Sequence, residues 1–228
     1  CYRTSLALAQ GGEVLAQAGR LLEVPAGARG LRQSEALFQH VKRLPELMEE
    51  MMASAAGEIA AVSVSAKPRP AADSYMPVFA AGASLAKALS SALRVRLIET
   101  THQQGHVRAA LYASALPEDF VCVHLSGGTT EILRVGEGLS IARLGGTTDI
   151  SAGQLVDRVG VALGLPFPCG PHLEKLAREG RAQSLLPVSM AGADLHCHLS
   201  GAEAQALRWL AAGEKSPAEV AAEVFDFL

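Results

Sequence analysis

The most restrictive feature of this 228-residue sequence is a pattern that occurs twice: strand, glycine turn, strand, then helices. In the first half, Thr4–Gln10 predicts a strand that ends at Gly11-Gly12 and returns as a hairpin. In the second half, Phe120–Leu125 runs into Gly127-Gly128 in the same way. Two such units in tandem predict an α/β fold with two lobes and a cleft between them.

The remaining elements follow from periodicity and turn residues. We place the lobes at residues 1–115 and 116–228. A helix capped by Ser34 should kink or restart at Pro45. The predicted strands are 4–10, 13–23, 59–65 (buried), 95–100, 120–125, 130–135 and 139–144; the other predicted helices are 79–93, 102–114, 151–163, 173–178, 202–212 and 218–227.

Composition excludes several classes of protein. Hydrophobic residues make up 49% and charged residues 19%, which is not the composition of a disordered chain. Apolar runs stay shorter than a membrane span, so we expect no membrane partner. The four cysteines are widely spaced, which argues against a zinc ribbon or a disulfide framework and predicts a cytoplasmic protein with reduced thiols.

The net charge of -3 conceals an asymmetry between the halves. Residues 1–114 hold 12 Lys and Arg against 9 Asp and Glu, whereas residues 115–228 hold 8 against 14. An anionic partner is therefore expected on the first half. Lys67 and Arg69, in a proline-stiffened loop, are candidate phosphate contacts, with a solvated surface loop as the alternative.

Two histidines, His102 and His106, are separated by one helical turn directly after a predicted strand. Imidazoles at i and i+4 share a helix face and can bind one metal ion. No glutamate follows the first histidine, so the general base of a metalloprotease is missing. The alternative is two surface histidines without a ligand.

Two further segments are candidate binding elements. In His124-Leu125-Ser126-Gly127-Gly128, glycine lets backbone N–H groups approach a phosphate; a plain hairpin turn is the alternative. Asp157 lies on a predicted helix that ends at a rigid Gly/Pro segment, 164–171, and could accept a hydrogen bond from a ribose or an amide. The alternative there is an exposed helix carboxylate.

Together these segments resemble one family, the tRNA N(6)-threonylcarbamoyladenosine transferases, also known as the glycoprotease or M22 peptidase family. The matching stretches, in family order, are Arg69-Pro70 with Tyr75-Met-Pro77, His102-x-x-x-His106, Leu125-Ser-Gly-Gly-Thr-Thr130, Asp149 with Gly153 and Asp157-Arg158, Gly164-Leu-Pro-Phe-Pro-Cys-Gly-Pro171, and Leu199-Ser-Gly201. The resemblance spans nearly the whole chain.

The resemblance implies the two-lobed fold of actin-like and sugar-kinase ATPases, with the second lobe truncated. It also implies one divalent metal ion, iron or zinc, held by His102 and His106, with His124 as a possible additional ligand. His124, Leu125, Ser126, Gly127 and Gly128 match the segment that holds threonylcarbamoyl-AMP, and Asp157 and Gly170 match two further contacts. The implied reaction transfers the threonylcarbamoyl group to N6 of adenosine 37 in tRNA, and the implied partners are tRNA, an adenine nucleotide and other subunits of that machinery.

Several positions depart from the family pattern. Tyr2-Arg3 replaces an acidic pair after Cys1, Ile150 replaces a second aspartate, and Gln154 replaces a glutamate. The Phe-Ser-Gly motif of the family has become His198-Leu-Ser-Gly201. A metal-binding aspartate and a nucleotide-binding asparagine of the family match no residue of this chain, and both ends look cut. We therefore expect a fragment of a divergent bacterial paralogue, with no assigned catalytic residue.

The departures leave two alternatives to the transferase. One is a non-catalytic, nucleotide-binding scaffold or regulatory paralogue, suggested by Tyr2-Arg3. The other is the metalloprotease named by the older family label, which the lack of a glutamate beside His102 disfavours.

Overall fold

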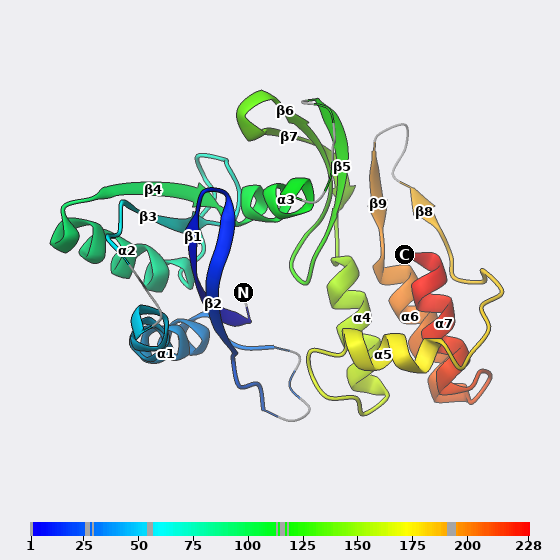
Figure 1. Cartoon of the computed structure of the whole chain (residues 1–228). Helices are drawn as coiled ribbons and strands as arrows, with labels where there is room; N and C mark the ends of the chain where they lie inside the picture. Colours follow the sequence, from blue (N-terminus) through cyan, green and yellow to red (C-terminus); the bar gives the residue numbers. More distant parts are fainter. Residues whose placement is uncertain are drawn as a thin grey trace. The chain divides into compact units, whose positions relative to one another are not determined.

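The structure is a computed structural model that describes residues 2–228 except 26, 27, 29, 54–56, 113, 115, 116, 118 and 191–194. Its elements form two units (Figure 1): unit 1 comprises Cys1–Glu23 with Leu31–Leu116, and unit 2 comprises Val24–Gly30 with Pro117–Leu228. Residues 115 and 116, between which we expected the lobe boundary, lie outside the described residues.

Unit 1 begins with an antiparallel hairpin of β1 (Arg3–Gln10) and β2 (Glu13–Leu21). The turn needs glycine because Gly11 and Gly12 have φ angles of +61° and +89°. The predicted hairpin is therefore confirmed.

A second, parallel pair of strands follows in unit 1, formed by β3 (Ala61–Lys67) and β4 (Arg96–Thr101). They are joined by α2 (Phe79–Leu93), which packs on β3. The prediction of a buried strand is wrong for β3, whose residues are half-buried or exposed along the groove described below.

Two more helices complete unit 1. The first, α1 (Gln33–Ala53), includes Ser34 and runs through Pro45 without restarting. It packs against both strands of the hairpin. The last helix is α3 (His102–Tyr112), which starts directly after β4.

The strands of unit 2 form a five-stranded sheet in the order β5-β6-β7-β9-β8. The strands β5 (Phe120–Leu125), β6 (Thr130–Gly136) and β7 (Ser140–Thr147) are an antiparallel meander, with the short η1 (Glu137–Leu139) in the second turn. The two short strands β8 (Ser189–Met190) and β9 (His196–His198) were not predicted, and β9 joins β7 in parallel.

The helices of unit 2 are α4 (Ala152–Ala162), α5 (Gly170–Ala177), α6 (Ser200–Ala212) and α7 (Pro217–Phe227). They lie together beside the sheet (Figure 1) and pack around one apolar core. Its fully buried side chains include Leu155, Val159, Leu173 and Val220.

The predicted α/β class is confirmed, and the positions of the long helices agree with the sequence prediction within a few residues. Among the described residues, no helix combines the length and apolarity needed to cross a bilayer.

Candidate functional site: a histidine pair and a glycine turn

The start of α3 is fixed by a reciprocal pair of hydrogen bonds. The Gln104 N–H donates to Thr101 Oγ1 (3.2 Å), and the Thr101 N–H donates to Gln104 Oε1 (3.1 Å). This capping box satisfies backbone donors that a helix start otherwise leaves open. The Gln103 N–H donates to the carbonyl of Pro68 (3.0 Å) and ties the same turn to the loop after β3. His102 is therefore held in the first turn of α3.

The two histidines face each other across one turn of α3. Their Nε2 atoms are 3.0 Å apart, and the ring centroids are 4.4 Å apart. The edge of the His102 ring meets Phe79 at a centroid distance of 5.7 Å, which restrains its orientation. The prediction that the two imidazoles share one face is confirmed.

This donor pair fits a metal ion. Two imidazole ligands of a tetrahedral ion, each about 2.0–2.1 Å from the metal, have nitrogens roughly 3.3 Å apart. The observed 3.0 Å requires only a small opening of the pair. Within the described part of the chain, no third His, Cys, Asp or Glu joins them. That the pair binds a metal remains a prediction.

The histidines line a groove of about 1070 Å³ in unit 1. Its lining residues come mainly from β1, β3, α1 and α2 and include the apolar side chains of Met48, Met51, Leu85 and Leu89. The apolar lining of the groove therefore extends to the two imidazoles.

The segment after β5 is a tight turn organised by Ser126. The Ser126 N–H donates to the Thr129 carbonyl (2.9 Å), and Ser126 Oγ accepts from the N–H groups of Gly128 (3.3 Å) and Thr129 (3.0 Å). The N–H groups of Ser126 and Gly128, two of those expected to hold a phosphate, are thus used within the turn. No heavy atom lies within 4 Å of where a Cβ would stand on Gly127 or Gly128, so one side of the turn is open.

The other side of this turn packs against the first turn of α4. The Gly153 N–H donates to the Ser126 carbonyl (3.2 Å), and Ser151 Oγ donates to the Gly127 carbonyl (2.9 Å). A Cβ on Gly153 would lie 2.4 Å from Gly127 Cα, closer than real contacts allow. Glycine at 153 is therefore required for this backbone contact.

Further along α4, Asp157 contacts the segment before α5. Its Oδ1 accepts the Cys169 N–H at 2.8 Å, next to Gly170. Burial raises the pKa of Asp157, and the Cys169 hydrogen bond partly opposes this rise. The structure thus brings Asp157 and Gly170 close together. The first turn of α4 contacts the glycine turn, and Asp157 lies in the middle of the same helix. That these residues bind a ligand remains a prediction.

His124 lies in β5 opposite Glu131 of β6, and its side chain is half-buried. Its Nδ1 lies 3.3 Å from Thr129 Oγ1. His124 therefore contacts the glycine turn, and its role as a metal ligand remains a prediction.

Asp149 has a structural role that sequence reasoning missed. Its carboxylate accepts the N–H groups of Ile150 (2.7 Å), Leu199 (2.9 Å) and Ser200 (3.0 Å). Burial by itself would raise the pKa of Asp149, but the hydrogen bonds from Ser200, Leu199 and Ile150 lower it to about 2. The residue ties the end of β7 to the start of α6, 50 positions away.

The positions that depart from the family pattern have defined structural roles. Ile150 is buried in the core of unit 2. Gln154 completes a capping box with Ser151, whose N–H donates to Gln154 Oε1 at 3.0 Å. The Arg3 guanidinium lies over Gly19 on the neighbouring strand, whereas Cys1 lies outside the described residues.

The S/T-x-x-Q spacing at Thr101–Gln104 and Ser151–Gln154 is the sequence signal that locates both site helices.

Comparison with known proteins identifies the family. A sequence profile described as tRNA N6-adenosine threonylcarbamoyltransferase matches residues 26–227. The chain belongs to this family.

Individual family members match over much of the chain. A tRNA N6-adenosine threonylcarbamoyltransferase of Pyrobaculum calidifontis is 33% identical over 194 residues, 84% of this chain and 55% of the relative. One from Geobacillus kaustophilus is 35% identical over 151 residues, 65% of this chain and 43% of the relative. One from Chlamydia trachomatis is 30% identical over 200 residues, 85% of this chain and 58% of the relative. The chain thus spans about half the length of the curated relatives that it matches.

Proposed function

We propose that the protein transfers a threonylcarbamoyl group from threonylcarbamoyl-AMP to N6 of adenosine 37 of tRNA, in a metal-dependent reaction. The observation that carries the proposal is the pair of facing Nε2 atoms on α3, in a chain whose relatives are named for this tRNA modification. In the transfer, a bond forms between N6 and the carbamoyl carbon while the carbon–oxygen bond to AMP breaks. AMP leaves with the electron pair, and the amine proton passes to water.

His102 and His106 would hold one divalent ion, iron or zinc, through Nε2. Such an ion supplies Lewis acidity toward a carbonyl oxygen. The Thr101–Gln104 capping box fixes the start of α3 and the Phe79 ring restrains the His102 imidazole before the ligand arrives, which reduces the reorganisation needed.

The glycine turn and Asp157 would bind the acyl-adenylate. The open side of Gly127 and Gly128 admits a ligand close to the backbone, whereas Gly153 supports the turn from behind. One oxygen of Asp157 accepts the Cys169 N–H, which leaves the other to accept a ribose hydroxyl near Gly170. His124, beside Thr129, is a candidate additional ligand of the ion.

The proposal includes the wider expectations drawn from the family resemblance. The chain would form the two lobes of an actin-like or sugar-kinase ATPase fold. It would work in the cytoplasm with other subunits of the threonylcarbamoylation machinery.

The test uses the full-length protein with its partner subunits, threonylcarbamoyl-AMP and an unmodified tRNA transcript. We expect modified adenosine 37 to be detected by mass spectrometry of the digested tRNA. His102→Ala and His106→Ala should each abolish modification and reduce the metal content measured by elemental analysis. His196→Gln, which removes an imidazole on β9, is the matched control and should leave both unchanged.

Two results would contradict the proposal. Nucleotide binding without turnover, unchanged in the His102→Ala and His106→Ala variants, would favour the scaffold alternative. Modification that proceeds in protein stripped of metal would refute the metal dependence.

A further inference from the structure

We propose that Arg94, Arg96 and Lys87, at the end of unit 1 where α2 turns into β4, form a contact site for the phosphate backbone of tRNA. This inference rests on the proposed function, because it concerns the same RNA substrate. We call these three residues the basic corner.

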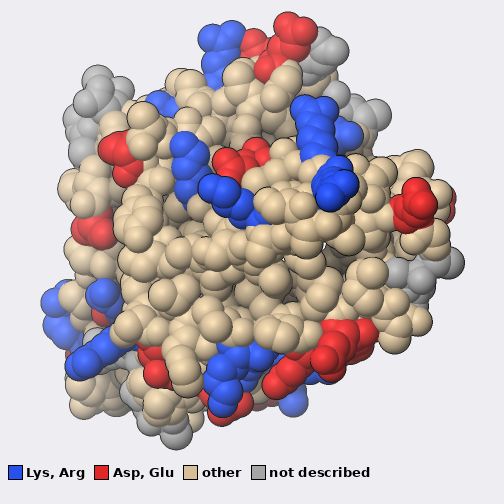
Figure 2. All heavy atoms as spheres, turned by 90° about the vertical axis from the view of Figure 1, so that its left-hand side faces the viewer, with Lys and Arg blue, Asp and Glu red and all other residues tan. Residues whose placement is uncertain are grey.

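The basic corner has an unusual charge pattern. Residues 74–98 contain three cations, Lys87, Arg94 and Arg96, and no Asp or Glu. All three side chains are exposed, and none forms an ion pair within the described residues. By contrast, Arg20 and Arg43 of the same unit pair with Glu50 and Glu23. Figure 2 turns this side of the molecule toward the viewer; basic and acidic side chains are scattered there over a mostly uncharged surface.

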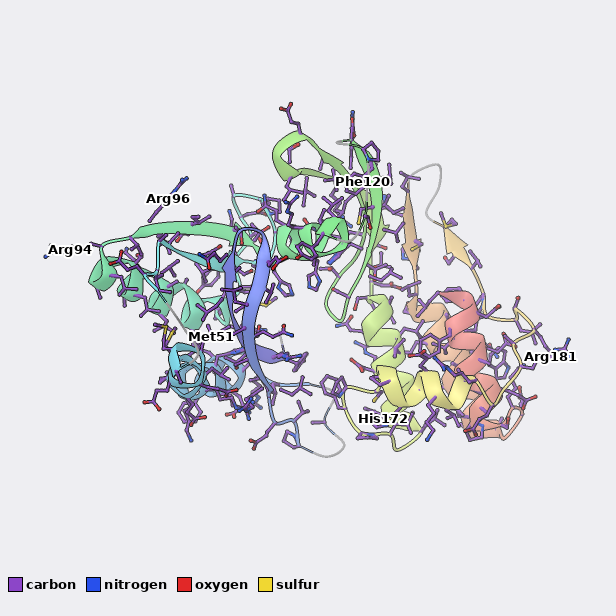
Figure 3. The ribbon with its side chains drawn as sticks, viewed as in Figure 1. Met51, Arg94, Arg96, Phe120, His172 and Arg181 are labelled. Atoms are coloured by element: carbon purple, nitrogen blue, oxygen red, sulfur yellow. The ribbon has the colours of Figure 1, made fainter. Side chains whose placement is uncertain are left out.

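Both arginines extend outward where α2 ends and β4 begins, in different directions (Figure 3). Arg94 is the C-cap of α2, and Arg96 is the first residue of β4. Lys87 lies two helical turns before Arg94, on the same side of α2. The three exposed cations therefore lie close together along the chain, at the end of unit 1 where α2 turns into β4.

Arg94 has a backbone conformation that favours glycine. Its φ and ψ angles are 56° and 40°, in the left-handed region, and its N–H and that of Val95 close the last turn of α2 on Ser91 and Ser90. Glycine takes this cap position without a steric penalty, and an arginine does not. Backbone strain of this kind is found preferentially at functional sites. A cationic side chain at 94 thus stands where stability alone would favour glycine.

The position of the corner fits a large polyanion. Arg96 begins β4 and His102 follows its last residue, so the corner and the histidine pair are about 20 Å apart along the strand. A free nucleotide does not span that distance, whereas a folded RNA does. If adenosine 37 reacts beside the histidines, phosphates elsewhere in the tRNA can meet the corner. Lys and Arg contacts to phosphates provide most of the sequence-independent affinity for nucleic acids.

The test measures affinity of the full-length protein for an unmodified tRNA transcript, at several salt concentrations, together with Tm. For the Arg94→Gly/Arg96→Gln double variant we expect affinity to fall about 10-fold and the slope of log Kd against log salt to decrease by roughly 1.5–2. Arg94→Gly alone should raise Tm by about 2 °C while weakening binding.

Arg94→Lys keeps the charge and should bind like the wild type. Arg178→Gln, which removes an exposed arginine of unit 2, is the matched charge control and should change affinity less than 2-fold.

The outcomes separate this inference from the proposed function. If the wild-type protein binds tRNA and the Arg94→Gly/Arg96→Gln variant binds it with the same affinity and salt slope, the basic corner alone is overturned. Wild-type protein that binds no tRNA would overturn the proposed function as well. A loss of binding to an acidic partner protein, with tRNA binding unchanged, would assign the corner to a different ligand. A fall in both Tm and affinity for Arg94→Gly would mark Arg94 as structural and would also count against the proposal.

Discussion

The two units of this chain bury their apolar residues differently. In unit 2, four helices surround one continuous core that includes Leu155, Leu173 and Trp209. In the described part of unit 1, the buried apolar residues that cluster form two small groups, one around Phe79 and one around Leu47, beside a groove of about 1070 Å³. The unit with the continuous core holds its glycine turn through packing, whereas the histidine pair of unit 1 depends mainly on the local capping of one helix.

Intrinsic fluorescence can follow the two units separately. The single tryptophan, Trp209, lies in unit 2, and all three tyrosines, Tyr2, Tyr75 and Tyr112, lie in unit 1. Unfolding followed at tryptophan and tyrosine wavelengths therefore reports on each unit, and the four predictions below use this separation.

The largest expected difference comes from the same truncation made in each unit. Leu155→Ala removes a side chain with 0% exposure from the continuous core and should cost about 4 kcal/mol in the free energy of unfolding of unit 2. Leu47→Ala, at 1% exposure in a small cluster, should cost about 2–3 kcal/mol because fewer neighbours surround the space left behind. Urea unfolding measures both. Equal costs would show that the small clusters of unit 1 pack as well as the core of unit 2.

Gly153→Ala tests the packing behind the glycine turn. The new Cβ would stand 2.4 Å from Gly127 Cα, so the turn must move, and we expect a loss of about 2–3 kcal/mol in unit 2 and weaker nucleotide binding. Thermal unfolding and a nucleotide titration measure the two effects.

Gly201→Ala is the control for the same change. No atom lies within 4 Å of its added Cβ in α6, so this variant should be neutral or more stable by up to about 1 kcal/mol. A Gly153→Ala protein that behaves like Gly201→Ala would contradict the contact between α4 and the turn.

Asp149 should make the folding stability of unit 2 fall at low pH. Because its pKa in the folded state is about 2, below the ordinary value of 3.8, its stabilisation is complete above pH 4 and is lost as the pH falls toward 2. We expect Asp149→Asn to reduce stability at pH 7 by about 2 kcal/mol and to flatten this acid dependence. The measurement is tryptophan-detected urea unfolding between pH 2 and pH 7, and a variant with unchanged acid dependence would rule out this role.

His40 should give unit 1 a smaller pH effect in a different range. It lies buried between α1 and β1, where Thr4 Oγ1 is 2.7 Å from its Nδ1, and burial is the largest of the effects that lower its pKa. The neutral form fits the fold, so stability should be complete above pH 6.5 and decrease as the pH falls below it. We expect a loss of roughly 1 kcal/mol or less, seen by tyrosine fluorescence and absent in Thr4→Val/His40→Leu. A pH dependence of the same size in the double variant would assign it to other groups.

Much of the local structure was readable from the sequence. The hairpin at Gly11-Gly12, the strand Phe120–Leu125 and the helix Phe79–Leu93 are confirmed, and so is the shared face of His102 and His106. Sequence reasoning failed where a segment depends on distant partners. The strand β9 has only three residues and exists because β7 and β8 flank it.

The site divides in the same way. Glycine turns and S/T-x-x-Q helix starts are determined by the sequence itself, because each involves residues at most four positions apart. Only the tertiary structure decides that Gly153 supports Gly127, that Asp157 meets Cys169, and that Asp149 holds α6. Each of these contacts joins residues 12 to 50 positions apart. Such pairs form only when the helices and strands that carry them pack together, and no local pattern encodes that meeting.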